Sequence, residues 1–204
     1  MASSLIQSKQ YHKILIVSSD RGSIGRNFSE PESSALLGDA AAAIIIEKSK
    51  NSGIIDYKME TFPEGASFTQ VKGGGTFRHP DNPKTVSSDH YFTMSGPKIY
   101  KMARKKVYNM INNILLQNNL NVKDIDLLIP HQASGTAIKA YSKFGGFNQN
   151  KVMNIISEYG NCVSASIPLA LCIAIEKNKI NKNDLIMMIG TGAGLSVAST
   201  IIKY

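Results

Sequence analysis

Runs of mainly apolar residues recur along the chain and predict strands, of which those at 14–17 and 36–46 are expected to be buried. These runs lie at residues 14–17, 36–46, 126–130, 152–156, 184–189 and 195–202. Apolar residues at helical spacing predict helices at residues 2–9, from Pro97 onward, at 134–144 and at 164–177. Because strands and helices alternate, we expect a layered α/β fold.

One long stretch, residues 51–95, departs from this pattern. It contains three consecutive glycines, Gly73 to Gly75, and the prolines Pro80 and Pro83. Irregular stretches of this length are usually functional loops or linkers. We therefore expect three parts, residues 1–50, 51–95 and 96–204.

Composition narrows the class of protein. The 204 residues, 43% of them hydrophobic, suffice for one large domain or two small ones. No apolar run reaches the roughly 18 residues of a membrane span, and the first residues do not resemble a secretory signal. The only cysteines, Cys162 and Cys172, form neither a disulfide framework nor a metal site by their spacing. We expect a cytoplasmic protein that is not bound to a membrane.

The net charge of +8 is concentrated in one part of the chain. Between Lys98 and Lys151, nine basic residues stand against Asp124 and Asp126, which gives this segment a charge of +7. Such a basic face suits nucleic acid, anionic lipid, the phosphates of CoA or an acidic carrier protein. The alternative interpretation is a helix face that is simply solvated.

Three features that follow apolar strands can carry chemistry: His131, Asn161 and the glycine-rich turn from Gly190 to Gly194. In open α/β sheets, ligands bind at the carboxyl ends of the strands. A histidine there can act as a donor or base near pH 7, and an asparagine amide donates without titrating. Glycines let backbone N–H groups approach an oxyanion. The turn precedes a strand, whereas a dinucleotide-binding fingerprint precedes a helix.

Several sequence boxes occur in the order found in one enzyme family. They are Pro130-His131-Gln132-Ala133, Tyr159-Gly160-Asn161, Ser164 to Ala170, the turn at 190–194, Leu37 to Ala43, Phe92 to Pro97 and Ile14 to Asp20. Together they resemble the C-terminal part of ketoacyl-ACP synthase III, a member of the thiolase superfamily. The resemblance implies an incomplete thiolase-like α/β/α fold. Residues 1–50 would be the remnant of the N-terminal half, 51–95 a linker or insert, and 96–204 the C-terminal half.

The resemblance also implies an activity, an acyltransfer in fatty acid or polyketide-like biosynthesis. The family's catalytic set is Cys-His-Asn, and His131 and Asn161 match two of its members. Acyl-CoA and malonyl-ACP would be the substrates, without a further cofactor or a metal. The turn at Gly192, Ala193 and Gly194 would shape the active site.

Partners follow from the same resemblance. Lys139 and Lys143 would receive the acyl carrier protein, and the chain would form a homodimer or pair with an N-terminal half. Nucleic acid is not an expected partner.

The nucleophilic cysteine of the family would precede the helix predicted at residues 2–9, so neither Cys162 nor Cys172 occupies its place. We therefore expect the chain on its own to be inactive. Two alternatives remain beside the condensing enzyme: a non-catalytic thiolase-fold subunit and a truncated, inactive fragment.

Overall fold

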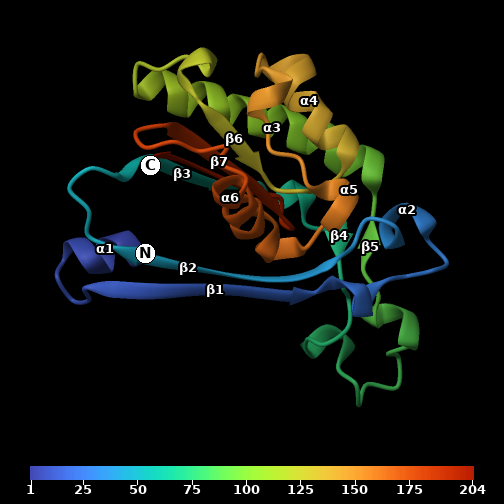
Figure 1. Ribbon diagram of the computed structural model, residues 1–204. Helices are drawn as coiled ribbons and strands as arrows, with labels where there is room; N and C mark the ends of the chain where they lie inside the picture. Colours follow the sequence, from blue (N-terminus) through green and yellow to red (C-terminus); the bar gives the residue numbers. More distant parts are fainter.

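The chain builds a central four-stranded sheet that is covered by helices on both faces, with a two-stranded ribbon outside one helix layer (Figure 1). The computed structural model describes residues 1–204, apart from the side chains of residues 32 and 33. The strands are β1 (Lys13–Arg21), β2 (Asp39–Glu47), β3 (Gly53–Thr61), β4 (Thr69–Gln70), β5 (Thr93–Met94), β6 (Leu127–Pro130), β7 (Leu185–Gly192) and β8 (Ser196–Lys203). The α-helices are α1 (Ala2–Gln7), α2 (Pro31–Ser34), α3 (Gly96–Gln117), α4 (Gly135–Gly145), α5 (Ile156–Tyr159) and α6 (Ser166–Glu176). Short 3₁₀ helices are η1 (Gly22–Gly25), η2 (Pro63–Gly65), η3 (Thr76–Arg78), η4 (Ser87–His90), η5 (Val122–Asp124), η6 (Gln149–Lys151) and η7 (Val163–Ala165).

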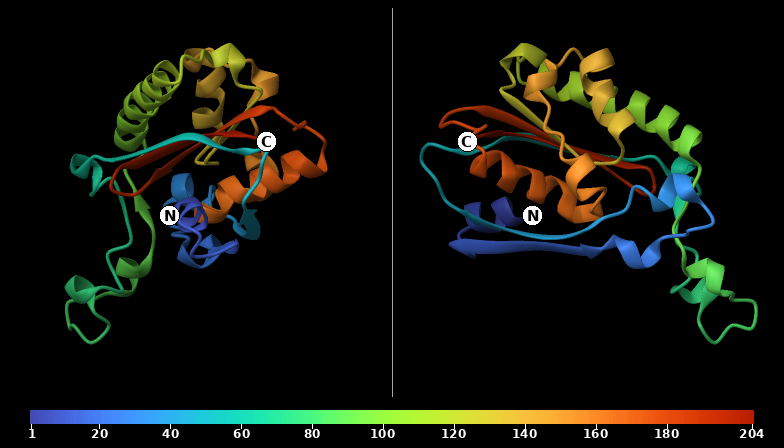
Figure 2. Two further views of the ribbon diagram at one scale, coloured as in Figure 1. Left: turned by 90° about the vertical axis from the view of Figure 1, so that its left-hand side faces the viewer. Right: turned by 45° about the vertical axis from the view of Figure 1, so that its right-hand side comes forward.

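The central sheet has the strand order β3-β8-β7-β6. Strands β6 and β7 are parallel, whereas β8 is antiparallel to both β7 and β3. Helices α3 and α4 cover one face, α6 covers the other, and the ribbon of β1 and β2 lies beyond α6 (Figure 2). The segment between β4 and β5 projects away from these layers. The fold is therefore a layered α/β arrangement, as the sequence predicted.

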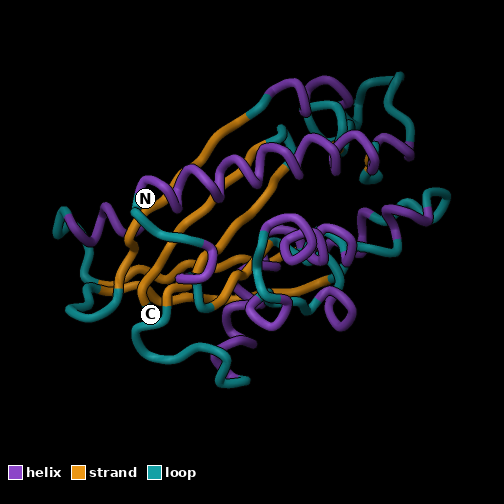
Figure 3. The backbone as a smooth tube through the Cα atoms, turned by 90° about the horizontal axis from the view of Figure 1, so that it is seen from above, coloured by secondary structure: helices purple, strands orange, loops and turns teal.

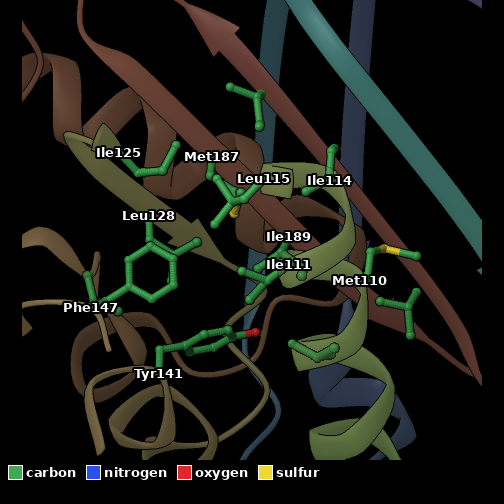
Figure 4. Packing of buried hydrophobic residues seen from close by; sticks show 14 of the residues in the cluster. Met110, Ile111, Ile114, Leu115, Ile125, Leu128, Tyr141, Phe147, Met187 and Ile189 are labelled. Carbon is green, nitrogen blue, oxygen red and sulfur yellow. The ribbon is translucent and has the colours of Figure 1, made fainter. Parts of the chain in front are cut away.

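Helix α3 forms the largest part of the core because its sequence is strongly amphipathic. Pro97 lies in its first turn, and Val107, Met110, Ile111, Ile114 and Leu115 are buried at helical spacing. The helix runs across the sheet (Figure 3). Its buried side chains pack against strand and α4 residues in one cluster (Figure 4).

Two predicted elements differ in the structure. Residues 152–156 do not form a strand: Val152 makes an isolated bridge to Leu128, and α5 begins at Ile156. The side chain of Gln132 bonds the backbone of Met153 and Ile155, and so takes up groups that a further strand would use. Strand β7 also extends to Gly192, so the glycine-rich turn is shorter than expected.

The stretch at residues 51–95 is less irregular than predicted. Its beginning forms β3, which pairs with β8 over nearly its whole length and therefore belongs to the central sheet. The alternating apolar and polar residues of this strand gave a weak signal, since it lies at the edge of the sheet. The division of the chain into three domains stays a prediction.

The ribbon of β1 and β2 exposes a continuous apolar face. Leu15 pairs with Ile45 across the ribbon, and their side chains are 62% and 68% exposed, as is 61% of Val17. The opposite face packs against α6, where Ile44 joins the core. The apolar runs predicted buried strands, and within these 204 residues one face of the ribbon is left uncovered.

None of the described helices combines the length and the hydropathy that a membrane-spanning segment requires.

The outer face of the ribbon predicts self-association, because exposed apolar strand surfaces promote contact between molecules. We expect the 204-residue chain to form oligomers or aggregates as its concentration rises, and the triple variant Leu15→Thr, Val17→Thr, Ile45→Thr to remain monomeric at higher concentrations. Sedimentation velocity over a concentration series measures this. Leu116→Thr, which changes an exposed leucine on α3, is the control. Equal association of the triple variant and the unmodified chain would contradict the prediction.

Candidate active site

His131 lies directly after β6, at the carboxyl end of a strand at the edge of the central sheet. Its backbone N–H donates to the Ile189 carbonyl at 2.8 Å, which continues the pairing of β6 with β7. Its own carbonyl accepts from Ala133 at 2.9 Å. Among the described residues, the imidazole ring itself forms no hydrogen bond, so both ring nitrogens are available to a bound molecule.

The surroundings of His131 favour its neutral form. Burial lowers the pKa of His131 from 6.5 to about 4, because an imidazolium would lose its hydration there. At pH 7 the ring is therefore an uncharged donor on one nitrogen and an acceptor on the other.

Asn161 is fixed by its backbone. Its N–H donates to the Leu36 carbonyl at 2.6 Å, and its carbonyl accepts from the Gly38 N–H at 2.9 Å. Its Oδ1 accepts from the Val163 N–H at 3.0 Å. This bond orients the side-chain amide and leaves its NH₂ group free to donate.

A cavity of about 220 Å³ surrounds His131. Residues from β3, η7, α6, β7 and β8 complete its wall: Met59, Val163, Ser164, Ile167, Gly190, Thr191, Gly192, Ser196 and Ala198. The first turns of η7 and α6 therefore face the histidine. The N–H groups at the start of η7 already have partners: that of Val163 donates to Asn161 Oδ1, and those of Ser164 and Ala165 donate to Asp20 Oδ2.

The predicted site residues are only partly brought together. His131 and Gly192 line the same cavity, whereas Ala193 and Gly194 form the turn beyond it. Asn161 is not among the lining residues, although Val163 and Ser164, which follow it closely, are. The convergence of the His131 and Asn161 side chains stays a prediction.

Lys139 and Lys143 lie outside the cavity, exposed on α4. The Lys143 ammonium lies 5.2 Å from the ring centroid of the exposed Phe144.

Gln132 is a buried residue that sequence reasoning did not single out. Its side chain is fully buried, and its Nε2 donates to the carbonyls of Pro130 at 2.8 Å and Met153 at 3.3 Å. Its Oε1 accepts from the Ile155 N–H at 2.9 Å. Gln132 thus ties the segment leading to Asn161 to the strand end that carries His131. Its neighbours in the sequence include the polar residues His131 and Ser134, so no local pattern indicated its burial.

Asp20, at the end of β1, was also missed as a site residue. Its Oδ2 accepts from the backbone N–H groups of Ser164 at 3.0 Å and Ala165 at 3.2 Å, and from the Ser164 hydroxyl. The carboxylate therefore caps the turn that leads into α6 and holds one wall of the cavity. No local pattern shows this contact, because the partners lie 144 residues apart.

Glycines allow the ribbon to approach the Asn161 segment closely. A Cβ atom on Gly38 would lie 1.9 Å from the Tyr159 carbonyl oxygen, and one on Gly160 would lie 2.9 Å from that of Leu36. Gly160 also has a φ of 71°, which L-residues rarely adopt. Side chains at these positions would separate the two segments.

The two cysteines are free. Cys162 is buried, and its Sγ donates to the Tyr159 carbonyl at 3.2 Å. Burial, and then the nearby carboxylates of Asp39 and Asp20, raise the pKa of the Cys162 thiol. Because the thiolate is the nucleophilic form, this environment disfavours Cys162 as a nucleophile. In the described part of the chain, no group of His, Cys, Asp or Glu side chains is placed to hold a metal ion.

Comparisons with known proteins agree with this geometry. The protein named beta-ketoacyl-[acyl-carrier-protein] synthase III of Solibacter usitatus is 31% identical over 204 residues, which cover 98% of this chain and 61% of that protein. The protein of the same name from Rickettsia bellii is 32% identical over 100% of this chain and 62% of its own length. The crystal structure of 3-oxoacyl-[acyl-carrier-protein] synthase III from Aquifex aeolicus superposes with a TM-score of 0.87 at 25% identity, over 100% of this chain and 61% of that one.

These likenesses define a thiolase-like protein. The family model described as 3-oxoacyl-[acyl-carrier-protein] synthase III matches residues 1–63, and the model of its C-terminal region matches residues 115–204. The chain belongs to the 3-oxoacyl-[acyl-carrier-protein] synthase III family, a family of acyltransferases, and spans 61–62% of the length of these relatives. The prediction of a resemblance to the C-terminal part alone was too narrow, because the models of both regions match this chain.

The lowered pKa of His131 predicts a dependence of stability on pH. The unfolded chain takes up the proton near pH 6.5, whereas the folded chain takes it up only near pH 4. The unfolded state therefore binds more protons in this window, and the free energy of unfolding falls as the pH falls from about 6.5 towards 4. We expect His131→Gln to reduce this loss by roughly 1–3 kcal/mol.

Urea unfolding at a series of pH values measures the difference between the two proteins. His12→Gln, at an exposed histidine, should leave the loss unchanged. If His131→Gln and the unmodified chain follow the same pH profile, the histidine is not held neutral by the fold.

Proposed function

We propose that the chain supplies the enolate-stabilising part of a β-ketoacyl-ACP synthase III-type condensing enzyme in fatty acid or polyketide-like biosynthesis. The observation that carries this proposal is a neutral His131 in a cavity whose wall is formed by the turn after Asn161 and by Gly192. The relatives that share the family name support it.

The reaction uses a thioester donor and a malonyl thioester. An acyl group passes from acyl-CoA to a cysteine thiolate, and CoA leaves as the thiolate, which takes up a proton from water. The malonyl thioester then loses carbon dioxide: its C–C bond breaks, and the electron pair forms a thioester enolate. The enolate carbon attacks the acyl-enzyme carbonyl, and the cysteine thiolate leaves with formation of the β-ketoacyl thioester.

The chain's own residues act on the enolate. The N–H of the neutral His131 ring and the amide NH₂ of Asn161 donate hydrogen bonds to its oxygen, where negative charge develops in the transition state. A neutral donor suits this role because it stabilises the charge without transferring a proton. Asp20 holds the turns of η7 and α6 against this cavity by accepting from the N–H groups of Ser164 and Ala165.

We place the nucleophilic cysteine outside these 204 residues. The raised pKa and the burial of Cys162 support this assignment, and they favour an inactive chain when it is tested alone. A second polypeptide segment of the family, or a second copy of the chain, would cover the apolar outer face of the ribbon. The free cysteines suit the cytoplasm, where we place the enzyme.

Intact-mass measurement tests the proposal. The chain incubated with acetyl-CoA or longer acyl-CoAs should gain no acyl group on Cys162 or Cys172. Co-expressed with a family segment that carries the Ala-Cys-(Ala/Ser)-Gly box, the complex should gain one acyl group on that cysteine and release carbon dioxide from malonyl-ACP. His131→Ala should reduce carbon dioxide release by roughly 100-fold or more while acylation persists. One acyl group on Cys162 of the chain alone would refute the assignment of the nucleophile.

The carrier protein is expected to bind through charge. In the reconstituted complex, Lys139→Glu with Lys143→Glu should raise the KM for the acyl carrier protein roughly tenfold, since each exposed pair contributes about 0.5–1 kcal/mol. Added salt should have the same effect on the unmodified complex. Lys177→Glu with Lys179→Glu is the matched control at exposed lysines. A KM that ignores both the reversal and the salt would mean that these lysines are only solvated.

A further inference from the structure

The side-chain amide of Asn161 takes its orientation from a neighbouring peptide group. Its Oδ1 accepts from the Val163 N–H at 3.0 Å, and within the described part of the chain the amide forms no other hydrogen bond. Because an amide that is held at its oxygen follows the group that holds it, the direction in which the NH₂ group donates depends on the position of the Val163 peptide.

Val163 has a backbone conformation that its own side chain disfavours. Its φ is 49°, in the left-handed region, where a β-branched residue is an outlier. Its Cγ2 also lies against the ribbon, since a Cβ atom on Gly22 would come within 3.7 Å of it. Such a conformation persists only where the surroundings impose it, so another part of the molecule must hold Val163 in place.

Asp20 supplies this restraint. One of its carboxylate oxygens accepts from the N–H groups of Ser164 at 3.0 Å and Ala165 at 3.2 Å, and from the Ser164 hydroxyl. Asp20 is itself fixed near the end of β1, where it pairs with Ala40 of β2. The peptide that follows Val163 is therefore tied to the ribbon, while the N–H of Val163 is tied to the Asn161 amide.

The two N–H groups depend on the carboxylate to different degrees. The Ala165 N–H is shared with the Cys162 carbonyl at 3.0 Å. Among the described residues, by contrast, Asp20 is the only partner of the Ser164 N–H. Without the carboxylate, the Ser164 peptide could turn, and Val163 could relax to a negative φ.

We propose that Asp20 is a positioning residue for the condensing reaction: it keeps Val163 in the left-handed conformation and so directs the NH₂ group of Asn161 towards the thioester enolate. Asp20 does not line the cavity around His131, so it acts through the turn and not on the substrate. This role rests on the proposed function, which assigns the enolate to His131 and Asn161. It makes the enolate step, but not the acylation of the cysteine, depend on a residue of the ribbon.

Carbon dioxide release from malonyl-ACP tests this role in the complex reconstituted with a family segment that carries the cysteine. We expect Asp20→Ala to lower kcat for release at least tenfold. The KM for malonyl-ACP, and the rate of cysteine acylation followed by intact mass, should both stay within twofold. Asp20→Asn should lose less than threefold in kcat, because the carboxamide oxygen still accepts from both N–H groups.

A second substitution tests the connection through Val163. Glycine adopts a positive φ about as readily as a negative one. Val163→Gly should therefore raise kcat for release at least threefold when it is added to Asp20→Ala.

Asp39→Ala is the matched control. This carboxylate lies at the same end of the ribbon and accepts from the Ser23 N–H at 2.7 Å and from the Ser23 hydroxyl at 2.6 Å. Because it does not hold the turn after Asn161, its loss should leave carbon dioxide release within twofold.

Hydrogen exchange in the 204-residue chain alone separates the role of Asp20 from the proposed function. Measured by mass spectrometry on peptides that span residues 161–165, exchange should be at least tenfold faster in Asp20→Ala and unchanged in Asp39→Ala. If the unmodified complex releases no carbon dioxide, the proposed function fails and the catalytic role of Asp20 fails with it. The exchange rates would still show whether the carboxylate holds the turn.

Four results would overturn the proposal. Unchanged release in Asp20→Ala would show that the reaction does not need the carboxylate. A similar loss in Asp39→Ala would trace the effect to a general loosening of the ribbon end. Equal losses of acylation and release in Asp20→Ala would leave Asp20 a purely structural role. A loss that Val163→Gly does not restore would show that Asp20 does not act through Val163.

Discussion

The contact between Asn161 and the segment around Gly38 is the constraint on which the site depends. Two backbone hydrogen bonds clamp Asn161 between Leu36 and Gly38, and the absence of a side chain at Gly38 lets the Tyr159 carbonyl come within contact distance. Because these bonds join residues more than 120 positions apart, they form only when the ribbon has docked on α6. The position of a side chain in the C-terminal region is therefore set by residues from the beginning of the chain.

Asp20 strengthens the same junction from the other side of the ribbon. Its carboxylate accepts from the Ser164 N–H at the start of a helix, and it shares the Ala165 N–H with the Cys162 carbonyl. The intervening Val163 has a φ of 49°, which is uncommon for a β-branched residue and is tolerated where the surroundings fix the backbone. The capped turn, rather than local preference, thus determines the shape of the cavity wall next to His131.

Much of the layered fold could be predicted from the sequence, because α3, α4, α6, β6 and β8 carry clear periodicity or apolar runs. The apolar pattern wrongly predicted a strand at residues 152–156. There the Gln132 side chain bonds backbone groups of Met153 and Ile155 that a strand would use for pairing. The apolar run of β1 likewise did not predict the exposure of its outer face, because a run of apolar residues does not show which part of a protein covers it. For the site, His131 stood out as a polar residue after a strand, whereas Asp20 and Gln132 gained their roles only through contacts distant in sequence.

The bonding of Gln132 restricts which residues can stand beside the histidine. One end of this side chain both donates to two carbonyls and accepts from one N–H group. An ionised glutamate accepts only, a lysine donates only, and a methionine of similar size does neither. The carboxamide of Gln132 therefore supplies both donor and acceptor within one planar group. Without it, two different residues would be needed, so few side chains could replace glutamine at this position.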